Sequence, residues 1–250
     1  MDDFKNEATL FMIFDILGDT RRTGPLLWHI KRERLEDIKD HTIDVMLIAR
    51  MLKKYLPYYV DFSKLMDYLM FHDLPEAITG DITKFEGVPD EEIERVTNVA
   101  INYLNANFGD VVDFGEIIGA YEGQRDLEAK IAKMIDKLHS ATTFIKYESE
   151  KHVNMDDPRI IPELRNHPFV VKKYNEGADL ADIFFEFHMK AINISDDECK
   201  KFRITREDAD RLVSAIRGFG TELYNRKQNQ TLLNAKDDFP PEALDYNTNI

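Results

Sequence analysis

The sequence predicts an all-α protein. Its apolar residues recur at the spacing of helix faces, and no convincing alternating run typical of a β-strand occurs. Glycine and proline are sparse, with 11 and 9 among 250 residues, so few positions interrupt the helices. No run of about eighteen apolar residues occurs, so no transmembrane helix is expected. The chain is long enough to bury a sizeable core, as one large domain or a domain with extensions.

Helix boundaries follow from the residues that start and stop helices. Helices are expected over residues 3–17, 35–55, 63–78, 90–107, 126–150, 180–192 and 205–225. The first stops near Gly18, and a polar, basic loop follows over residues 19–34. The second ends before Pro57. The third predicted helix, over residues 63–78, contains histidine and acidic residues that could bind a metal ion.

The later helices have their own signals. Asp90 is a candidate cap for the helix that follows Pro89, and the sequence after Thr205 resembles a capping sequence. The helix over residues 126–150 places apolar residues at the 3.6-residue period, at Leu127, Ile131, Met134, Ile135 and Leu138. No internal repeat is apparent.

Charge and cysteine content narrow the function classes. The net charge is −14, which argues against a nucleic-acid polymer as partner but leaves a small nucleotide open. The single cysteine, Cys199, excludes an internal disulfide framework and fits a reducing cytoplasm. The acidic N-terminus lacks the pattern of a signal peptide, so we expect a cytoplasmic protein that does not bind membranes.

The most informative run is Phe71-His72-Asp73-Leu74-Pro75-Glu76-Ala77-Ile78-Thr79-Gly80-Asp81. Adjacent His72 and Asp73 can offer a nitrogen and an oxygen to one metal ion. On a helix, Glu76 would lie one turn away on the same side. Asp81 follows a Thr-Gly break that can aim it back at the site. Burying these acids is costly unless a cation compensates them, and a divalent metal is the obvious candidate.

Two further residues could complete a metal site. His41 is a polar residue on the apolar stripe of its helix; taken alone, it is more simply a core histidine. Asp136 borders a similar stripe; taken alone, it is more simply a surface carboxylate paired with Lys133 or Lys137. Two imidazoles and two carboxylates from separate helices suit one divalent ion such as Mn, Fe, Co, Ni or Zn. Four protein ligands leave a position open for water, as in catalytic sites.

This pattern resembles the HD-domain phosphohydrolase superfamily, over about residues 8–150. The run from His72 to Asp81 is closer still to the His-Asp-x-x-Glu-x-x-Thr-Gly-Asp signature of the bacterial 5'-deoxynucleotidase branch and its oxetanocin-resistance-type relatives. The resemblance implies an HD-domain helical bundle over residues 1–155. We expect a C-terminal helical extension over 156–227, packed on that core, and a tail over 228–250.

The resemblance also implies the roles of individual residues. The implied metal ligands are His41, His72, Asp73 and Asp136. Glu76 would orient or deprotonate the attacking water, and Asp81 would act as a second acid near the nucleophile or the leaving oxygen.

Substrate contacts are expected from the basic loop and the turn after the motif. Arg22 is the first candidate for binding phosphate, and Lys84 is a weaker one that is more simply a solvated side chain. Trp28 could stack on a base or pack in the core. The deoxynucleotidases have an adjacent Arg-Trp pair before the first ligand, whereas Arg22 and Trp28 are separated here.

The expected function is hydrolysis of phosphate esters of small nucleotides with one divalent transition metal. The leading hypothesis is that the protein is a (deoxy)nucleoside 5'-monophosphatase. A nucleoside triphosphate phosphohydrolase on the same metal core is the nearest alternative, and a nucleotide-sensing module without turnover is another. The chain could pair as a homodimer through apolar helices at its ends.

Overall fold

The computed structural model describes residues 4–24, 35–82, 87–149 and 166–228. Within these ranges the only β-type pairing is an isolated bridge between Arg21 and Asp37, so the predicted all-α fold class is confirmed. The helices are α1 (Lys5–Ile16), α2 (Ile38–Leu52), the 3-10 helix η3 (Lys53–Tyr55), α3 (Phe62–Phe71), α4 (Glu76–Thr79), α5 (Asp90–Phe108), α6 (Phe114–Glu122), α7 (Leu127–Ser149), α9 (Pro168–Asn175), α10 (Leu180–Ala191), α11 (Asp196–Phe202) and α12 (Arg206–Gln228). Among the helices described, none is both long and apolar enough to cross a bilayer.

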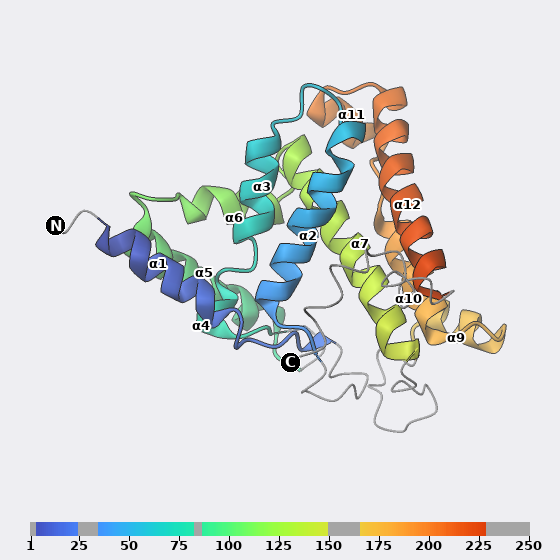
Figure 1. The fold of residues 1–250 in the computed structure, drawn as a ribbon, viewed down its shortest axis with the longest axis horizontal. Coiled ribbons are helices and arrows are strands. Elements are labelled where there is room, and N and C mark those ends of the chain that lie inside the picture. Colours follow the sequence, from blue (N-terminus) through green and yellow to red (C-terminus); the bar gives the residue numbers. More distant parts are fainter. Residues whose placement is uncertain (1–3, 25–34, 83–86, 150–165, 229–250) are drawn as a thin grey trace, which may run out of the picture.

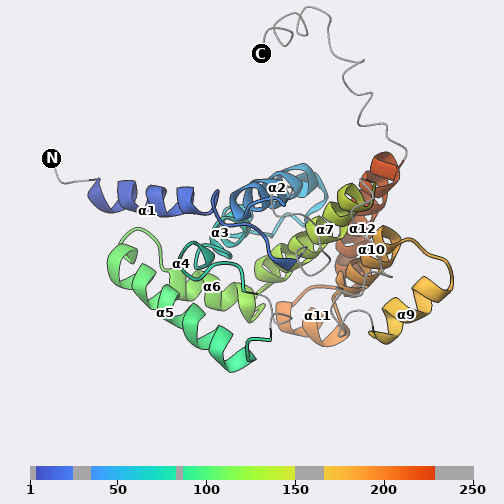
Figure 2. The same cartoon turned by 90° about the horizontal axis from the view of Figure 1, so that it is seen from below.

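Helix α7 is the central element. Figure 1 shows it running between α2 and α3 on one side and α10 and α12 on the other. Its residues Ile131, Ile135 and Leu138 are fully buried in the larger core, which also takes residues from α2, α3 and α12. A smaller core joins α1, α5 and α6, and the view from below in Figure 2 shows these three helices gathered at one end of the molecule. The site described next therefore lies on helices fixed by both cores.

Short polar side chains set the starts of the helices that carry the site. Asp37 accepts a hydrogen bond from the amide of Asp40 (2.8 Å) and caps α2. Asp61 accepts from the amides of Ser63 and Lys64 and caps α3. Each cap satisfies amides that a helix leaves without a partner, and so fixes where the first turn begins.

Two predicted helix details are wrong. The helix expected over residues 63–78 ends at Phe71, and a turn separates it from the short α4. Pro75 is the physical reason, because it has no amide hydrogen for the carbonyl of Phe71 and its ring would clash with that carbonyl. Asp90 is the first residue of α5 and makes no cap, since Pro89 occupies the cap position without a side-chain hydrogen bond. Helices α6, α9 and α11 have no counterpart among the predicted helix ranges.

Candidate metal centre

The four predicted ligands come from three parts of the fold. His41 lies in the first turns of α2, and it is fully buried with Val45, Ile48 and Leu52 on the same face. His72 caps the C-terminus of α3 and Asp73 follows it in the turn before α4. Asp136 lies on the central α7. These elements pack directly on one another, because α2 and α3 both contact α7.

The side chains converge on one point. His41 Nε2 lies 3.5 Å from Asp73 Oδ2 and 3.4 Å from Asp136 Oδ1, and His72 Nε2 lies 3.1 Å from Asp73 Oδ2. The two imidazole rings meet edge to face, with centroids 5.6 Å apart. Bonds of about 2.0–2.2 Å to a divalent ion place neighbouring donor atoms roughly 3.0–3.4 Å apart, which is close to these spacings.

Buried nitrogen atoms without a hydrogen-bond partner indicate that this point could hold a cation. Both His41 Nε2 and His72 Nε2 are buried and have no hydrogen-bond partner. The opposite nitrogen of each ring is engaged: His72 Nδ1 contacts the carbonyl of Leu69 at 3.0 Å, and His41 Nδ1 contacts His139 Nδ1 at 2.8 Å. A buried polar atom without a partner is costly, and a metal bound by these two nitrogens would remove that cost. The donor set therefore fits a divalent ion.

The protonation of His41 and Asp136 also suits a cation. Burial, followed by the positive charge of Arg22, lowers the pKa of His41 well below its usual value, so this imidazole is neutral. Burial also acts to lower the pKa of His72, but Asp73 outweighs it and raises that pKa. Burial tends to raise the pKa of Asp136, yet the charges of Lys137 and His72 lower it to about 2, so it is ionised at neutral pH.

Glu76 and Asp81 lie beside this cluster. Burial and the nearby carboxylates of Asp73 and Asp81 raise the pKa of Glu76 well above its usual value, and its Oε2 is buried without a partner. Gly80 ends α4 with a φ of 73°, a left-handed conformation that glycine adopts without strain. This turn leads the chain to Asp81, whose Oδ2 accepts a hydrogen bond from the amide of Thr23 (2.6 Å). Burial, and to a lesser degree the charge of Asp73, raise the pKa of Asp81 despite that bond.

Arg22 lies at the same place with spare hydrogen-bonding capacity. Its Nε pairs with Glu36 Oε1 at 3.4 Å, while Nη1 is buried without a partner. Burial acts against its charge, but the carboxylates of Glu36, Asp136, Asp73 and Asp81 outweigh that effect and raise the pKa of Arg22. A guanidinium held among acids beside a metal site is well placed to meet a phosphate. The other two predicted substrate contacts, Trp28 and Lys84, lie outside the described residues.

Three residues at the site are not among the predicted site residues. His139, on α7, contacts His41 directly, and Glu36 contacts both Arg22 and His139. Tyr121, on α6, packs its ring against His72 with centroids 4.8 Å apart. The spacing of His139, three residues after Asp136 on one helix, allows a place next to the ligands or in the lining of the pocket, although a structural or surface role is the more common one for such a histidine. Glu36 and Tyr121 carry no such local signal.

A helical protein that brings two imidazoles and two carboxylates to one buried point has the fold and the donor set of an all-α protein that could bind a metal ion. The chain belongs to the HD domain family, whose model matches residues 14–161. That span contains all four predicted ligands. The resemblance to the HD-domain superfamily is therefore confirmed.

Relatives at low identity carry names of one enzyme class. A 5'-deoxynucleotidase of Saccharomyces cerevisiae is 32% identical over 139 residues, which are 52% of this chain and 55% of that protein. The chain thus spans about half the length of that relative. A 5'-deoxynucleotidase of Homo sapiens is 23% identical over 147 residues, 58% of this chain and 71% of that protein.

Solved structures share the fold. The PH0347 protein of Pyrococcus horikoshii is similar with a TM-score of 0.55 and 19% identity, over 84% of this chain and 98% of that one. A protein of Magnetospirillum magnetotacticum, named a predicted metal-dependent phosphohydrolase, has a TM-score of 0.54 and 15% identity, over 89% of this chain and 93% of that one.

Proposed function

We propose that this protein is a divalent-metal-dependent phosphohydrolase of small nucleotides, and in particular a (deoxy)nucleoside 5'-monophosphatase. One observation carries the proposal: two unpaired buried histidine nitrogens meet Asp73 and Asp136 at ligand spacing, and Glu76 and Arg22 lie next to them. The names of the yeast and human relatives support the substrate class. The small-nucleotide substrate also agrees with a net charge of −14, which does not suit a long polyanion.

The metal would be held by His41, His72, Asp73 and Asp136, with Mn, Fe, Co, Ni and Zn as candidates. When bound, such an ion supplies Lewis acidity to a phosphoryl oxygen and makes water a stronger acid. The donor set is mixed nitrogen and oxygen, which suits these borderline ions better than a set of thiolates or of oxygens alone.

The remaining steps belong to side chains of the protein. Arg22 binds and orients the phosphate through its unpaired Nη1. Glu76 would take a proton from the attacking water as the new P–O bond forms, once the charge of a bound ion offsets the neighbouring carboxylates that raise its pKa. The bond to the 5'-oxygen breaks, and Asp81, whose pKa is raised, returns a proton to that oxygen. The products are orthophosphate and a nucleoside, and the two carboxyl groups have exchanged one proton each with the substrates.

A metal-by-substrate screen tests this proposal. The protein is stripped of metal, refilled with Mn, Fe, Co, Ni or Zn, and assayed with nucleoside mono- and triphosphates, in the ribo and deoxy forms. We expect orthophosphate release from monophosphates. Release of triphosphate, or of successive phosphates from triphosphates, would replace the monophosphatase with the triphosphohydrolase. Nucleotide binding without turnover under every metal would leave a sensing module and end the hydrolase proposal.

A further inference from the structure

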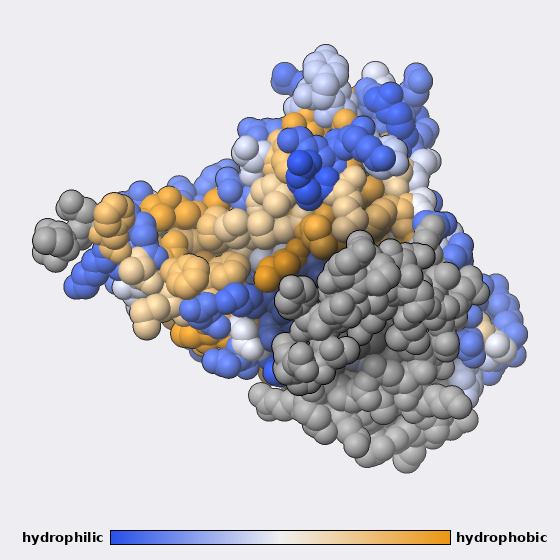
Figure 3. All heavy atoms as spheres, viewed as in Figure 1, coloured by the Kyte–Doolittle hydropathy of each residue, from blue (hydrophilic) through white to orange (hydrophobic). Residues whose placement is uncertain are grey.

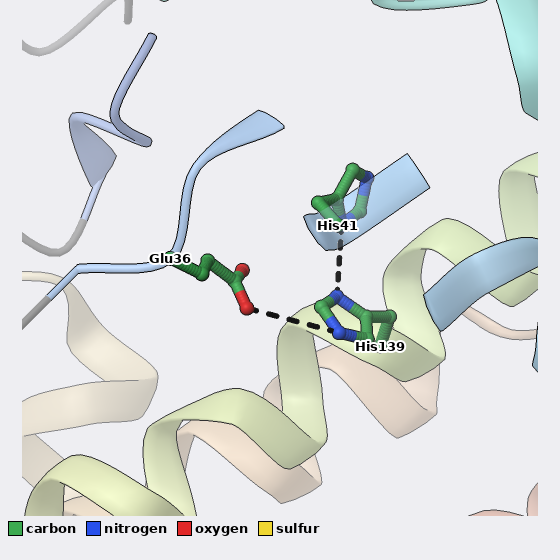
Figure 4. Close-up of side chains that lie close together, drawn as sticks. All are labelled: Glu36, His41 and His139. Carbon is green, nitrogen blue, oxygen red and sulfur yellow. Dashed lines mark hydrogen bonds and ion pairs between the residues drawn. The ribbon is translucent and has the colours of Figure 1, made fainter. Parts of the chain in front are cut away.

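His139 is a buried histidine that the proposed mechanism does not use. It lies on α7, one helical turn after Asp136, and is 5% exposed. Its Nδ1 lies 2.8 Å from Nδ1 of His41, and its Nε2 lies 3.2 Å from Asp44 Oδ2 and 3.9 Å from Glu36 Oε2. Figure 4 shows His41 and Glu36 each meeting one of the two ring nitrogens of His139. It therefore links a metal ligand to two carboxylates.

Hydrogen-bond geometry fixes where the protons lie in this chain of side chains. Two ring nitrogens 2.8 Å apart share one proton, so one donates and the other accepts. His41 needs a bare Nε2 to hold a cation, and in a neutral imidazole the proton is then on Nδ1. His139 Nδ1 must accept that proton, which leaves the proton of neutral His139 on Nε2. That is the edge that faces Asp44 and Glu36.

Resting on the proposed function, we propose that His139 is a positioning residue that holds His41 in the tautomer with a free Nε2 directed at the metal. Asp44, whose Oδ2 lies 3.2 Å from Nε2, in turn holds His139 in the tautomer that can accept, and Glu36 adds a negative charge 3.9 Å from the same nitrogen. A ligand histidine usually donates its other N–H to a carboxylate, carbonyl or water; here a second imidazole is the acceptor. Glu36 also pairs with Arg22, so its charge lies close to both His139 and the candidate phosphate contact.

A second metal ion between Glu36, His41 and His139 is the competing arrangement, because these residues also lie within metal-binding distance of one another. The contacts favour the hydrogen-bonded chain. His139 presents Nδ1 to His41 and Nε2 to the carboxylates, and one ion cannot bind both edges of a ring at once. The two arrangements differ in metal stoichiometry, which makes them separable.

The test compares three variants. His139→Phe removes the acceptor and keeps the ring volume, whereas His139→Asn keeps an acceptor oxygen close to the position of Nδ1. Thr143→Val is the matched control, because it removes a hydrogen bond to the carbonyl of His139 on the same helix and leaves the imidazole in place. Zinc affinity and stoichiometry are measured by competition titration, and the melting temperatures of the metal-free proteins show that each variant is folded.

We expect one zinc per chain at the site, a loss of about 10–100-fold in zinc affinity for His139→Phe, and near wild-type affinity for His139→Asn and Thr143→Val. Nitrogen-15 spectra of the imidazoles in the zinc-bound protein should place the proton of His41 on Nδ1. Unchanged affinity in a folded His139→Phe protein, a second zinc lost with His139, or a proton on Nε2 of His41 would overturn the assignment. Zinc binding that behaves as expected in a protein without nucleotide turnover would remove the proposed function alone.

Discussion

Asp73 is the residue on which both histidines depend. Its Oδ2 lies 3.1 Å from His72 Nε2 and 3.5 Å from His41 Nε2, so one oxygen faces both nitrogens. Asp136 Oδ1 lies 3.4 Å from His41 Nε2. A substitution at Asp73 would therefore remove a proposed ligand and a negative charge that lies close to both imidazoles.

The Glu76→Gln variant tests whether Glu76 contributes to the rate of hydrolysis without contributing to metal binding. Glutamine keeps the size of the side chain but cannot take a proton, so we expect kcat to fall by about 10²–10⁴-fold while the metal content stays at one ion per chain. Kinetics on the metal-loaded protein and elemental analysis provide the two measurements. Glu94→Gln, on the exposed side of α5, is the control and should leave both unchanged. Full activity in Glu76→Gln would remove this carboxylate from the mechanism.

The sequence predicted those site residues that belong to a recognisable motif. The four ligands, Glu76 and Asp81 all follow from one short run and two spaced residues that resemble a known family, and the structure brings them together. The site residues without a motif depend on tertiary packing. Tyr121 reaches His72 from a helix that was not predicted, and Glu36 reaches His139 from a position more than a hundred residues away.

At the scale of elements, Asp126 joins α3 to the start of α7. Its Oδ1 accepts from the amide of Ala129, and its Oδ2 accepts from the hydroxyl of Tyr68 (2.8 Å) and lies 2.7 Å from Lys64 Nζ. Both helices carry groups of the metal centre. This carboxylate therefore helps to fix the position of α3 relative to α7, and so that of His72 relative to Asp136.

Asp126→Asn should lower the free energy of unfolding by about 1–2 kcal/mol at pH 7, because asparagine can still cap the helix but carries no charge. Burial tends to raise the pKa of Asp126, but hydrogen bonds from Lys64, Ala129 and Tyr68 outweigh it and lower that pKa below 3.8. A carboxyl with a lowered folded pKa stabilises the protein above its unfolded pKa and loses that effect as the pH falls. The difference between variant and parent should therefore shrink as the pH falls through the lowered pKa of the folded protein.

Urea unfolding at several pH values measures this effect. Asp197→Asn is the control, since Asp197 is almost fully exposed and its ion pair with Lys200 lies at the surface. Its stability should stay within about 0.5 kcal/mol of the parent at every pH. A deficit in Asp126→Asn that is constant down to low pH would show that the charge plays no part.

Two glycines on α12 predict opposite outcomes. A methyl group at Gly220 would collide with Leu138 of α7 and approach Met189 of α10 at 3.3 Å, whereas Gly218 has open space around it. Gly220→Ala should destabilise the protein by about 1–3 kcal/mol through overpacking. Gly218→Ala should stabilise it by about 0.5–1 kcal/mol through helix propensity. Thermal unfolding of the two variants compares them directly, and a stabilised Gly220→Ala would contradict the close packing of α12 on α7.

The helices were predicted well where long apolar stripes exist and poorly where they are short. Helices α5, α7 and α10 match the expected ranges closely because each has a sustained 3.6-residue period. The break after His72 was missed because the apolar period continues through Pro75, although the proline geometry forbids a straight helix there. Helices α6 and α9 have nine and eight residues, which is too short for periodicity to decide.

At the scale of the whole molecule, metal should contribute to stability. The proposed ligands from α2, α7 and the turn before α4 would meet at one ion, which could bind only the folded chain. At a free-metal concentration about 100-fold above Kd, binding adds about 2.7 kcal/mol. For a chain of this size that corresponds to a Tm increase of roughly 5–10 °C.

Thermal unfolding with and without a chelator measures this increase. The folded Asp73→Asn variant should melt at the same temperature in both conditions. An equal shift in that variant would place the stabilising metal elsewhere in the molecule.

Apolar side chains are exposed on α1 and α2. Phe11 and Met12 are 66% and 67% exposed, and Ile43 and Leu47 are 53% and 50% exposed. Figure 3 shows hydrophobic residues over this region of the face in view. Three statements from the sequence remain predictions: that the chain forms a homodimer, that domain boundaries lie at residues 155 and 227, and that the protein is in the reducing cytoplasm, as Cys199 indicates. Light scattering of the purified protein, with Leu47→Glu as comparison, would examine the first of these.

The pair of hydrogen bonds between Thr23 and Asp81 has a consequence for truncated forms of the protein. The amide of Thr23 donates to the carboxylate of Asp81, and its hydroxyl donates to the carbonyl of the same residue (2.8 Å). A shortened chain that begins after residue 24 would retain the four proposed metal ligands but lose the anchor of Asp81, together with Arg22 and the α1 residues of the smaller core. Metal content alone would therefore be an unsafe measure of whether such a fragment keeps the proposed activity.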